Sequence, residues 1–437
     1  MKSLRFFAGG VLLLLAISTR LDAAAYDITD LGTLGGTNSY GYAINASGQV
    51  VGMATDSMGI GRPALFSGTG SGNTDLGTLG GTSGSARAIN DAGQVVGFSS
   101  TASDVHATLF SGTGSGNTDL GTLGGSSSYA YGINSAGKIV GYALTAGGVF
   151  HATLFSGTGS GNTDLGTLGG TYSYAFAIND SDQIVGKAYP LSGDYHATLY
   201  SGTGTGNMDL GLLTGGYSTA LAINASGTIA GDATNSGGAY RIVRFSGTGT
   251  GNADLGSLGG ADCYGRAINA SGQIVGSSQT SSNTVYHGFI YMPGKGMVDL
   301  NSLTDPALGW VVTDAAGIND NGQIAATGVK SGNAHALLLT PGTPISTGVP
   351  TVTTKTKKKS KTPKSKILIK GETNGVVTSV TYRIGKKKKF KTARGTANWM
   401  CKLKLAPGRN KVIVIAHGPG GDSRPLKLII TRIVNAG

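Results

Sequence analysis

Short runs of apolar residues, each bounded by glycine and small polar residues, recur along the first three quarters of the chain. Residues 131–134 and 138–144 are two such runs on either side of a Ser-Ala-Gly segment at 135–137. This pattern predicts two strands joined by a tight turn, because glycine supplies the positive φ that the turn needs. Residues 151–155 predict a third strand and residues 161–166 a short fourth, and no stretch has a helical period.

This four-strand pattern occurs in seven copies between residues 30 and 341. Each copy carries Asp-Leu-Gly or, in the last, Asp-Leu-Asn, then Ile-Asn before a glycine, then a His or Arg before an apolar run. Successive Asp anchors are 44 or 45 residues apart, and the seventh copy has an insertion at residues 305–310. We expect the Asp anchors to be structural; they are Asp30, Asp75, Asp119, Asp164, Asp209, Asp254 and Asp299. The Asn anchors are Asn45, Asn90, Asn134, Asn179, Asn224, Asn269 and Asn319.

Copies of this length with four strands each predict an all-β fold, a seven-bladed β-propeller whose blades pack around a central channel. The seventh copy ends at residues 335–339 without a fourth strand, and the ordered part of the chain is expected to begin with a lone strand at residues 30–32. The N-terminal strand is therefore expected to complete the last blade. An open β-solenoid is the alternative, although its repeats are usually shorter.

The anchors also carry a family resemblance. Residues 119–125, 89–97 and 106–107 resemble the HAF family of extracellular repeats, whose pattern is Asp-Leu-Gly-x-Leu-Gly-Gly, Ile-Asn-x-x-Gly-Gln-[Val/Ile]-Val-Gly and His-Ala-Phe. The resemblance covers almost all of residues 30–341. It departs from the family where threonine replaces the Phe of His-Ala-Phe and where Asp182 replaces a turn glycine. The resemblance implies a secreted bacterial repeat protein and brings no established activity.

The N-terminus has the features of a signal peptide, residues 1–25. Lys2 and Arg5 precede an apolar run at residues 6–17, and small residues lead to a cleavage site after Ala25. The run is too short for a membrane-spanning helix, which needs about 20 apolar residues, and no later segment approaches that length. We therefore expect a secreted or periplasmic protein that associates, in one hypothesis, with the cell surface.

Charge divides the chain into two parts. Residues 26–345 hold 9 Lys or Arg against 19 Asp, whereas residues 346–437 hold 22 against 2 acidic residues. Within the second part, residues 346–366 are rich in Lys, Ser and Thr, a composition that predicts a flexible linker. The whole chain has a net charge of +12. The domains expected are thus a propeller at 26–345, this linker, and a basic domain at 367–437.

The basic domain is expected to be a small β-sandwich. Alternation of apolar and polar residues at 397–405 is the period of a half-buried strand. Residues 393–399 and 405–410 resemble bacterial immunoglobulin-like domains, which implies a spacer or a surface-contacting module. The strands expected are residues 367–369, 375–384, 390–405, 411–416 and 426–433.

The lysine clusters predict contact with polyanions, because a basic surface binds them in a salt-dependent way. Anionic envelope polysaccharide or a lipid surface is the expected partner, since a signal peptide and the scarcity of interleaved aromatic residues argue against nucleic acid. The simpler reading is a solvated linker. The contact residues proposed are Lys357, Lys358, Lys359, Lys386, Lys387, Lys388 and Lys389.

One repeat position holds a His or Arg in every copy. Metal binding would need three or four ligands converging on one ion, and groups on separate blades are too dispersed for that unless they line the narrow channel. We expect these residues to donate structural hydrogen bonds, with the repeated Asp as one candidate acceptor, and we expect no metal and no cofactor. The ring consists of Arg62, His106, His151, His196, Arg241, His287 and His335.

Other candidate chemistry is sparse. The Gly-rich run that begins at Ser67 lacks the Gly-Lys-[Ser/Thr] and the helix of a phosphate-binding loop, so it predicts a flexible turn. Cys263 and Cys401 are expected to be small buried residues, with a bridge between them disfavoured. The only glutamate is Glu372, and seven further aspartates form no recognisable motif: Asp56, Asp104, Asp194, Asp232, Asp262, Asp305 and Asp314.

Two hypotheses of function follow. The first is a non-enzymatic binding or scaffold protein, in which the propeller offers a repeated interaction surface to an unknown protein or glycan and the basic module anchors it. The alternative is a polysaccharide hydrolase or lyase with an Asp-based site at the channel, and we assign no catalytic residue. A channel lined by non-repeated Asp would favour the enzyme, and one lined by repeated small residues would favour the scaffold.

Overall fold

The computed structural model describes residues 26–281, 285–342, 351–354, 359–374, 379–385, 390–393, 398–418, 421–423 and 425–432. The signal peptide predicted at residues 1–25, with its cleavage site at Ala25, lies outside these residues. Residues Ala25–Gly342 form one compact unit, and the chain from Thr343 onward belongs to a second. We call them the N-terminal and C-terminal units.

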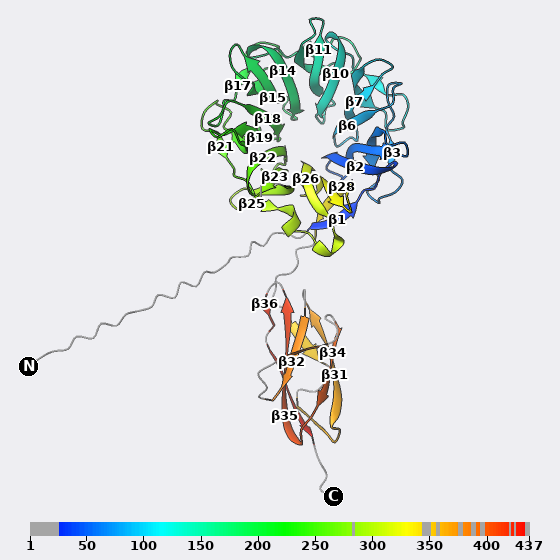
Figure 1. Cartoon of the computed structure of the whole chain (residues 1–437), viewed down its shortest axis with the longest axis vertical. Helices are drawn as coiled ribbons and strands as arrows, with labels where there is room; N and C mark the ends of the chain where they lie inside the picture. The colour runs from blue at the N-terminus through cyan, green and yellow to red at the C-terminus, as the bar shows by residue number, and fades with distance from the viewer. Residues whose placement is uncertain are drawn as a thin grey trace, which may run out of the picture. The chain divides into compact units, whose positions relative to one another are not determined.

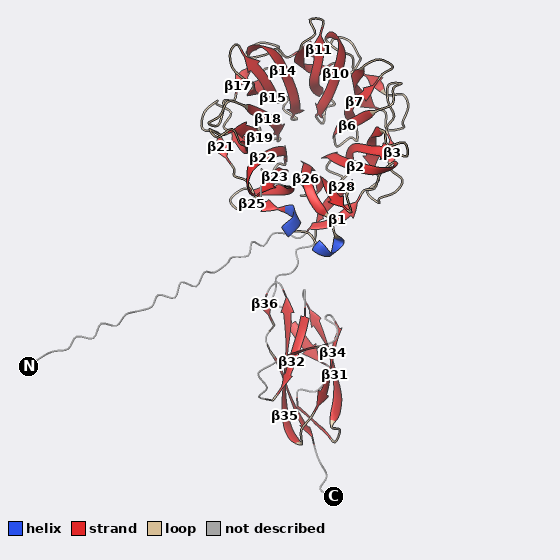
Figure 2. Ribbon diagram, in the orientation of Figure 1, coloured by secondary structure: helices blue, strands red, loops and turns tan. Residues whose placement is uncertain are grey.

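The described N-terminal unit is all-β apart from two short 3₁₀ turns, and its strands form seven four-stranded antiparallel sheets (Figures 1 and 2). The first strands are β2 (Gly35–Ile44), β6 (Gly84–Ile89), β10 (Gly124–Ile133), β14 (Gly169–Ile178), β18 (Ser218–Ile223), β22 (Gly259–Ile268) and β26 (Val311–Ile318). The second strands are β3 (Val50–Asp56), β7 (Val95–Ser100), β11 (Ile139–Thr145), β15 (Ile184–Pro190), β19 (Ile229–Thr234), β23 (Ile274–Thr280) and β27 (Ile324–Lys330).

The third and fourth strands are on average shorter than the first and second strands, and the fourth strands are the shortest. The third strands are β4 (Gly61–Phe66), β8 (Val105–Phe110), β12 (Phe150–Phe155), β16 (His196–Tyr200), β20 (Tyr240–Phe245), β24 (Tyr286–Met292) and β28 (Asn333–Pro341). The fourth strands are β5 (Thr74–Asp75), β9 (Thr118–Asp119), β13 (Thr163–Asp164), β17 (Met208–Asp209), β21 (Ala253–Asp254), β25 (Gly296–Asp299) and β1 (Tyr26–Asp30). The insertion of the seventh copy contains η1 (Leu300–Ser302) and η2 (Pro306–Leu308).

The seventh sheet takes its fourth strand from the N-terminus, as the sequence predicted. β1 pairs with β28 in the register Tyr26↔Pro341 to Asp30↔Leu337. Neighbouring sheets contact each other along the chain, and β2 of the first sheet contacts β26, β27 and β28 of the last. Buried side chains between the sheets are mostly Leu, Val, Ile and Ala, and each Asp-Leu-Gly motif in copies one to five supplies a fully buried leucine.

The first strands begin earlier than the sequence predicted. β10 starts at Gly124 rather than residue 131, because its small polar residues pair with β11 through a register shift between Gly124 and Ser128. Gly137 has a φ of 79° in the turn that follows β10, as the turn requires. In the fourth copy Asp182 adopts this conformation, with a φ of 61°, which aspartate tolerates better than most side chains.

The C-terminal unit contains two sheets. One has the order β29-β31-β34, and the other β30-β37-β35-β32-β33, with β36 paired to β35. Both sheets contribute to one core, which includes Ile369, Leu403, Val412 and Leu428. The strands are β29 (Thr351–Thr354), β30 (Lys359–Thr362), β31 (Lys366–Asn374), β32 (Ser379–Ile384), β33 (Lys391–Thr392), β34 (Asn398–Lys404), β35 (Gly408–Gly418), β36 (Gly421–Asp422) and β37 (Leu426–Arg432).

The prediction of a flexible linker at residues 346–366 was wrong where the structure describes this segment. β29 pairs with β31, and β30 adds to β37 in parallel. Edge strands are held by backbone hydrogen bonds, so a Thr- and Lys-rich segment can join a sheet without supplying core side chains. The proposed contact residues Lys357, Lys358 and Lys386 to Lys389 lie outside the described residues, and Lys359 is the first residue of β30.

Candidate functional site

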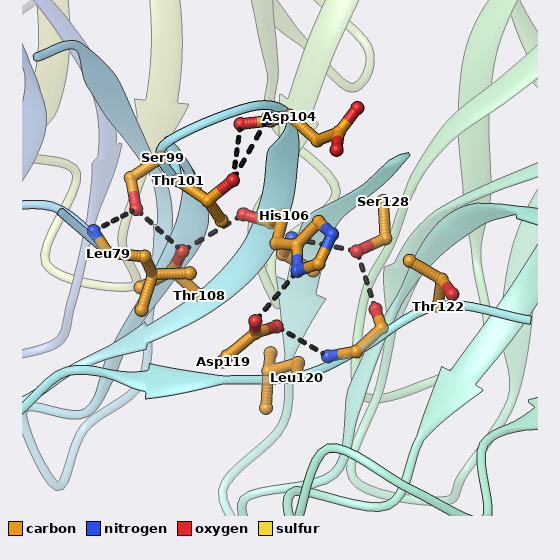
Figure 3. A network of polar contacts seen from close by, with 12 residues as sticks. Leu79, Ser99, Thr101, Asp104, His106, Thr108, Asp119, Leu120, Thr122 and Ser128 are labelled. Carbon is orange, nitrogen blue, oxygen red and sulfur yellow. Dashed lines mark hydrogen bonds and ion pairs between the residues drawn. The ribbon is translucent and has the colours of Figure 1, made fainter. Parts of the chain in front are cut away.

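The repeated His and Arg residues bind the repeated Asp in every copy. In the second sheet, His106 Nδ1 is 2.7 Å from Asp119 Oδ2 (Figure 3). Its Nε2 is 3.2 Å from the carbonyl oxygen of Ser126 at the start of the next sheet. Asp119 Oδ1 accepts a hydrogen bond from Gly121 N at 2.8 Å. The other His–Asp pairs measure 2.6–2.8 Å, and Arg62 and Arg241 lie 2.9 and 3.2 Å from their Asp partners.

These contacts join the third strand of each sheet to its fourth strand. In several copies they also reach the neighbouring sheet. No group of three or more His, Cys, Asp or Glu residues able to hold a metal ion occurs within the described part of the chain. A repeated serine adds a second link between sheets: Ser128 Oγ donates to Gly121 O at 2.6 Å and accepts from Ala107 N at 2.9 Å. Free Cys263 takes this position in the sixth copy, where burial raises the pKa of its thiol to about 12.

The Asn anchors form a continuous ring of hydrogen bonds that the sequence did not predict. Each side-chain Nδ2 donates to the backbone oxygen of the Asn in the next copy at 3.0–3.3 Å. The last member, Asn319, donates to Asn45 O at 3.0 Å. Within copies, most Asn Oδ1 atoms also cap the turn between the first two strands, as Asn134 does for Lys138 N at 2.9 Å.

Hydrogen bonds anchor the Gly-rich loops. Asn73, at the end of the first loop, accepts from Ser67 N at 3.0 Å and donates to Leu31 O at 2.7 Å. The loop is thereby fixed to the preceding sheet. Most repeated polar side chains are thus occupied in holding the sheets together, which leaves the positions that differ between copies as candidates for binding.

Positions that differ between copies lie near one end of a central channel of about 640 Å³. The channel is lined by three residues from each first strand, with Asp314 as a fourth from β26, and two of the three shared positions are repeated Ala or Gly and repeated Ile. The third position varies: Tyr42, Arg87, Tyr131, Phe176, Leu221, Arg266 and Ala316. We call this end of the channel the channel mouth. It comprises the seven varied lining residues and two adjoining sets of strand positions, one of which includes Asp314.

Two adjoining strand positions also vary. Two residues before the varied lining position, the first strands hold Tyr40, Ser85, Tyr129, Tyr174, Thr219, Tyr264 and Asp314. Paired with these on the second strands are Met53, Phe98, Tyr142, Lys187, Asp232, Ser277 and Thr327. The first four copies therefore contribute mainly aromatic residues, and the last three mainly charged or hydroxyl residues.

The aromatic residues of the channel mouth form a contiguous cluster. The Tyr131 ring stacks on Tyr142 at a centroid distance of 5.4 Å and meets Phe176 edge-on at 5.7 Å. Tyr142 contacts Tyr174 edge-on at 4.9 Å. Aromatic side chains combine large apolar faces with a polar edge, which suits them to ligands that have both apolar and hydroxyl-bearing surfaces.

Three cations and two carboxylates accompany this cluster. The Arg87 guanidinium lies 4.4 Å from the centroid of Tyr42, and Lys187 Nζ lies 3.9 Å from that of Tyr195. Arg266 Nε is 3.6 Å from Asp314 Oδ1, which is longer than a hydrogen bond. Asp232 is only 6% exposed.

Unpartnered polar atoms gather at these positions. In the described N-terminal unit, the buried side-chain atoms without a hydrogen bond are Ser85 Oγ, Arg87 Nε, Asp232 Oδ1 and Asp314 Oδ1. All four belong to the channel mouth. Buried polar groups are normally paired, and an unpaired one costs about 1–3 kcal/mol. A cluster of such atoms outside the repeated hydrogen-bond network is therefore an indication of a ligand site.

Burial shifts the pKa of two charged residues of the channel mouth, Asp232 and Lys187. It raises the pKa of Asp232 to about 7, although Arg266 and Lys187 act in the opposite direction. Burial also lowers the pKa of Lys187, which Asp232 partly offsets. Asp232 therefore changes its charge near neutral pH. Perturbed carboxyl groups beside a channel are typical of functional sites, although structural networks also produce them.

The channel lining contains features of both functions that the sequence suggests. Repeated small residues and isoleucines line most of the channel, and the non-repeated Asp314 also reaches it. Asp232 adjoins it, whereas Asp56 accepts hydrogen bonds in its own turn and Asp305 caps η2. The sequence analysis missed Arg87, Arg266 and the tyrosines; a comparison of the seven copies position by position would have identified them.

The C-terminal unit has a separate basic surface on the outer face of β31 and β34. Buried Ile369, Cys401 and Leu403 alternate with exposed residues. Lys366 lies opposite Lys404, Leu368 opposite Lys402, and Lys370 opposite Met400. We call Lys366, Lys370, Lys402 and Lys404, with Leu368 and Met400, the lysine face. Like charges in directly opposed positions destabilise a sheet, so an anion bound there would relieve repulsion.

The comparisons with known proteins do not assign a family. No family model and no curated protein matches the chain. Among solved structures, the extracellular domains of a hybrid two-component system and of a one-component system from B. thetaiotaomicron match with TM-scores of 0.32 and 0.40, each at 12% identity and over 94% of this chain. The chain covers 55% and 59% of those two chains. Fibronectin(III)-like modules of Clostridium thermocellum CbhA match 39% of this chain at 16% identity, a TM-score of 0.18 and 90% coverage of their own length.

Among the described residues, no helix has the length and apolar character needed to span a membrane.

Proposed function

We propose that the N-terminal unit is a seven-bladed β-propeller that binds a saccharide at the channel mouth, in a secreted or periplasmic protein. The Asn ring, which returns from Asn319 to Asn45, and the β1–β28 pairing support a closed propeller. The observation that carries the binding site is the gathering, among aromatic side chains, of four buried polar atoms that have no hydrogen bond. Sugar rings fit such a site, because their apolar faces stack on aromatic rings while their hydroxyls bond to polar groups.

This proposal changes the hypothesis of a repeated interaction surface. The His, Arg, Asp, Ser and Asn anchors are mostly engaged in hydrogen bonds between strands and sheets, so the repeated residues serve the fold. The varied residues make one asymmetric site instead of seven equivalent ones. A single site predicts that each chain binds one ligand, whereas seven equivalent sites would bind through many weak contacts.

Replacing Tyr131 by Ala is expected to weaken saccharide binding about tenfold, because the side chain offers its ring both to the channel and to the cluster. Migration of the full chain in native gels cast with soluble pectin or xyloglucan would measure this. Met208→Ala, which removes a side chain that is 44% exposed on a fourth strand, is the matched control. Equal retardation of all three proteins, or retardation of none, would contradict a site at the channel mouth.

A hydrolase or lyase is the second candidate function. Asp314 lines the channel, and Asp232 titrates near neutral pH, so both could take part in catalysis. Incubation with the same polysaccharides, followed by assays for new reducing ends and for unsaturated products, separates the candidates. Cleavage that disappears in Asp232→Asn or Asp314→Asn would replace the binding role by catalysis.

We propose further that the C-terminal unit, as an immunoglobulin-like module, anchors the protein to an anionic envelope component through the lysine face. The four lysines surround two exposed apolar side chains, Leu368 and Met400, which are 45% and 36% exposed. The double variant Lys402→Gln/Lys404→Gln is expected to lower binding to phosphatidylglycerol vesicles or alginate and to reduce its dependence on salt. The doubly substituted Lys295→Gln/Lys330→Gln chain, altered only in the N-terminal unit, is the control. Binding that is insensitive to salt, or equal in both variants, would contradict the anchor.

A further inference from the structure

A side pocket of about 500 Å³ lies between the first and second sheets and shares Tyr42 and Arg87 with the channel. Its other walls include Tyr40, Met53 and Phe98 from the channel mouth. It therefore adjoins the proposed saccharide site. We refer to it as the side pocket.

The side pocket exists because two small residues replace aromatic residues of other copies. Ser85 stands where Tyr40, Tyr129, Tyr174 and Tyr264 occur. Gly61 stands where Phe150, Tyr195, Tyr240 and Tyr286 occur, just before the repeated His or Arg. Both small residues line the pocket. The fold accommodates a tyrosine at the Ser85 position in four copies, so the space is not a requirement of sheet packing.

The chemistry inside the side pocket favours an anion. Ser85 is 3% exposed, and its Oγ has no hydrogen-bond partner among the described residues. The Arg87 guanidinium is 4.4 Å from the Tyr42 centroid and 5.2 Å from that of Phe98, and its Nε is also unpartnered. Arg62, Arg241 and Arg266, by contrast, each lie within 4 Å of an Asp carboxylate.

Arg87 therefore has aromatic neighbours but no ion pair within the described chain. A half-buried guanidinium in this state has donors directed in a planar fork that matches carboxylate or sulfate oxygens. An adjacent hydroxyl can donate to the same anion. Neutral sugars satisfy hydroxyl groups equally well but leave the guanidinium charge uncompensated, so the pocket discriminates by charge.

We propose that the side pocket binds the anionic substituent, a carboxylate or a sulfate, of an acidic saccharide whose rings lie on the aromatic residues of the channel mouth. Arg87 is the anion-binding residue, and Ser85 determines specificity by leaving room for the substituent. This inference rests on the proposed saccharide site and names its ligand class.

Isothermal titration calorimetry of the full chain with short oligosaccharides tests the inference. The probes are tetragalacturonate, a sulfated galactan tetrasaccharide and neutral galactotetraose, which are too short to cross-link molecules. Arg87→Gln is expected to weaken binding of the preferred acidic probe about tenfold or more, because a charge-assisted hydrogen bond is lost. Ser85→Tyr is expected to weaken it similarly by filling the pocket as four other copies do.

Two controls keep the result specific. Arg244→Gln removes the same charge from an exposed position on β20 and should leave affinity unchanged. Lys402→Gln/Lys404→Gln should also leave it unchanged, since the lysine face belongs to the other unit. Thermal unfolding checks that each variant is folded, and Arg87→Lys should restore only part of the affinity, because an ammonium lacks the planar fork.

The preferred acidic probe identifies the substituent as carboxylate or sulfate. If galactotetraose binds as tightly as both acidic probes and depends on Tyr131 but not on Arg87, the side-pocket inference is overturned and the saccharide site stands. If no probe binds and the polysaccharide gels show no retardation, the proposed function itself fails. Acidic binding that is unchanged in both Arg87→Gln and Ser85→Tyr overturns the side-pocket inference alone.

Discussion

Replacing Asp232 by Asn is expected to stabilise the protein by roughly 2–4 kcal/mol at pH 8 and to change its stability little at pH 4. Asp232 is 6% exposed, and its Oδ1 lacks a hydrogen bond within the described chain. Burial, opposed in part by Arg266 and Lys187, raises its pKa from 3.8 to about 7. Asparagine has a similar shape and carries no charge.

The direction of the pH dependence follows from this raised pKa. Between about pH 4 and pH 7, the unfolded chain loses the Asp232 proton while the folded chain keeps it, so this residue makes the folded state progressively less stable as pH rises. Below that window both states are protonated and the penalty vanishes. Above about pH 7 both are ionised and the penalty is constant.

Calorimetric unfolding of both proteins from pH 4 to pH 8 would measure the difference. Asp27→Asn, which alters an exposed carboxylate on β1, should show no comparable trend. A gain of equal size at pH 4 and pH 8 would mean that the introduced amide stabilises the fold by a new hydrogen bond and that the buried charge is not the cause. Retention of a destabilising carboxyl group is understandable if binding at the channel mouth requires it.

Replacing Gly141 by Ala is expected to destabilise the N-terminal unit by roughly 3 kcal/mol or more. A Cβ atom at this position would lie 1.9 Å from Tyr129 O and 2.9 Å from Ala130 Cα. Both are backbone atoms of the paired strand β10, so they cannot move without breaking the sheet register. The same close approach recurs at the corresponding glycines of the first six copies.

Denaturant unfolding would measure this loss, with Gly147→Ala as the control, because the nearest atom to that Cβ is Thr145 Oγ1 at 3.6 Å. Similar stability of the two variants would show that the sheet can absorb the extra methyl group. The seventh copy has Ala326 at this position, and there the first strand has a register shift between Val312 and Asp314, whereas β10 keeps its register from Ser128 to Ala130. The exception thus coincides with a local change of backbone.

The repeat period and the apolar runs were sufficient to predict the strands, their fourfold grouping and the role of the N-terminal strand. They did not predict the early start of strands such as β10, because its first residues are small and polar and pair only through a bulge. They also failed for β29 and β30, whose pairing depends on backbone groups of distant strands. Local composition contains no information about such partners.

The candidate site was harder to predict for a different reason. Attention to repeated residues selects those that hold the sheets together, such as His106 with Asp119. Residues with free polar groups are the ones that depart from the repeat, and Arg87 and Ser85 look unremarkable in the sequence until the seven copies are aligned. Which departures meet in space depends on the register shifts and on the stacking of the sheets, neither of which a linear pattern specifies.

The bond from Asn319 to Asn45 joins residues 274 positions apart, and the pair His335–Asp30 joins residues 305 apart. During synthesis, these contacts cannot form until nearly the whole N-terminal unit has left the ribosome. Earlier intermediates would expose the surface of β2 that contacts the last sheet, and their seventh sheet would lack its fourth strand. Long-range contacts of this kind slow folding and prolong exposure of aggregation-prone edges. In the proposed closed propeller, these contacts would leave no free end from which sheets can detach one at a time, so unfolding would begin by breaking the bonds between the first and last sheets.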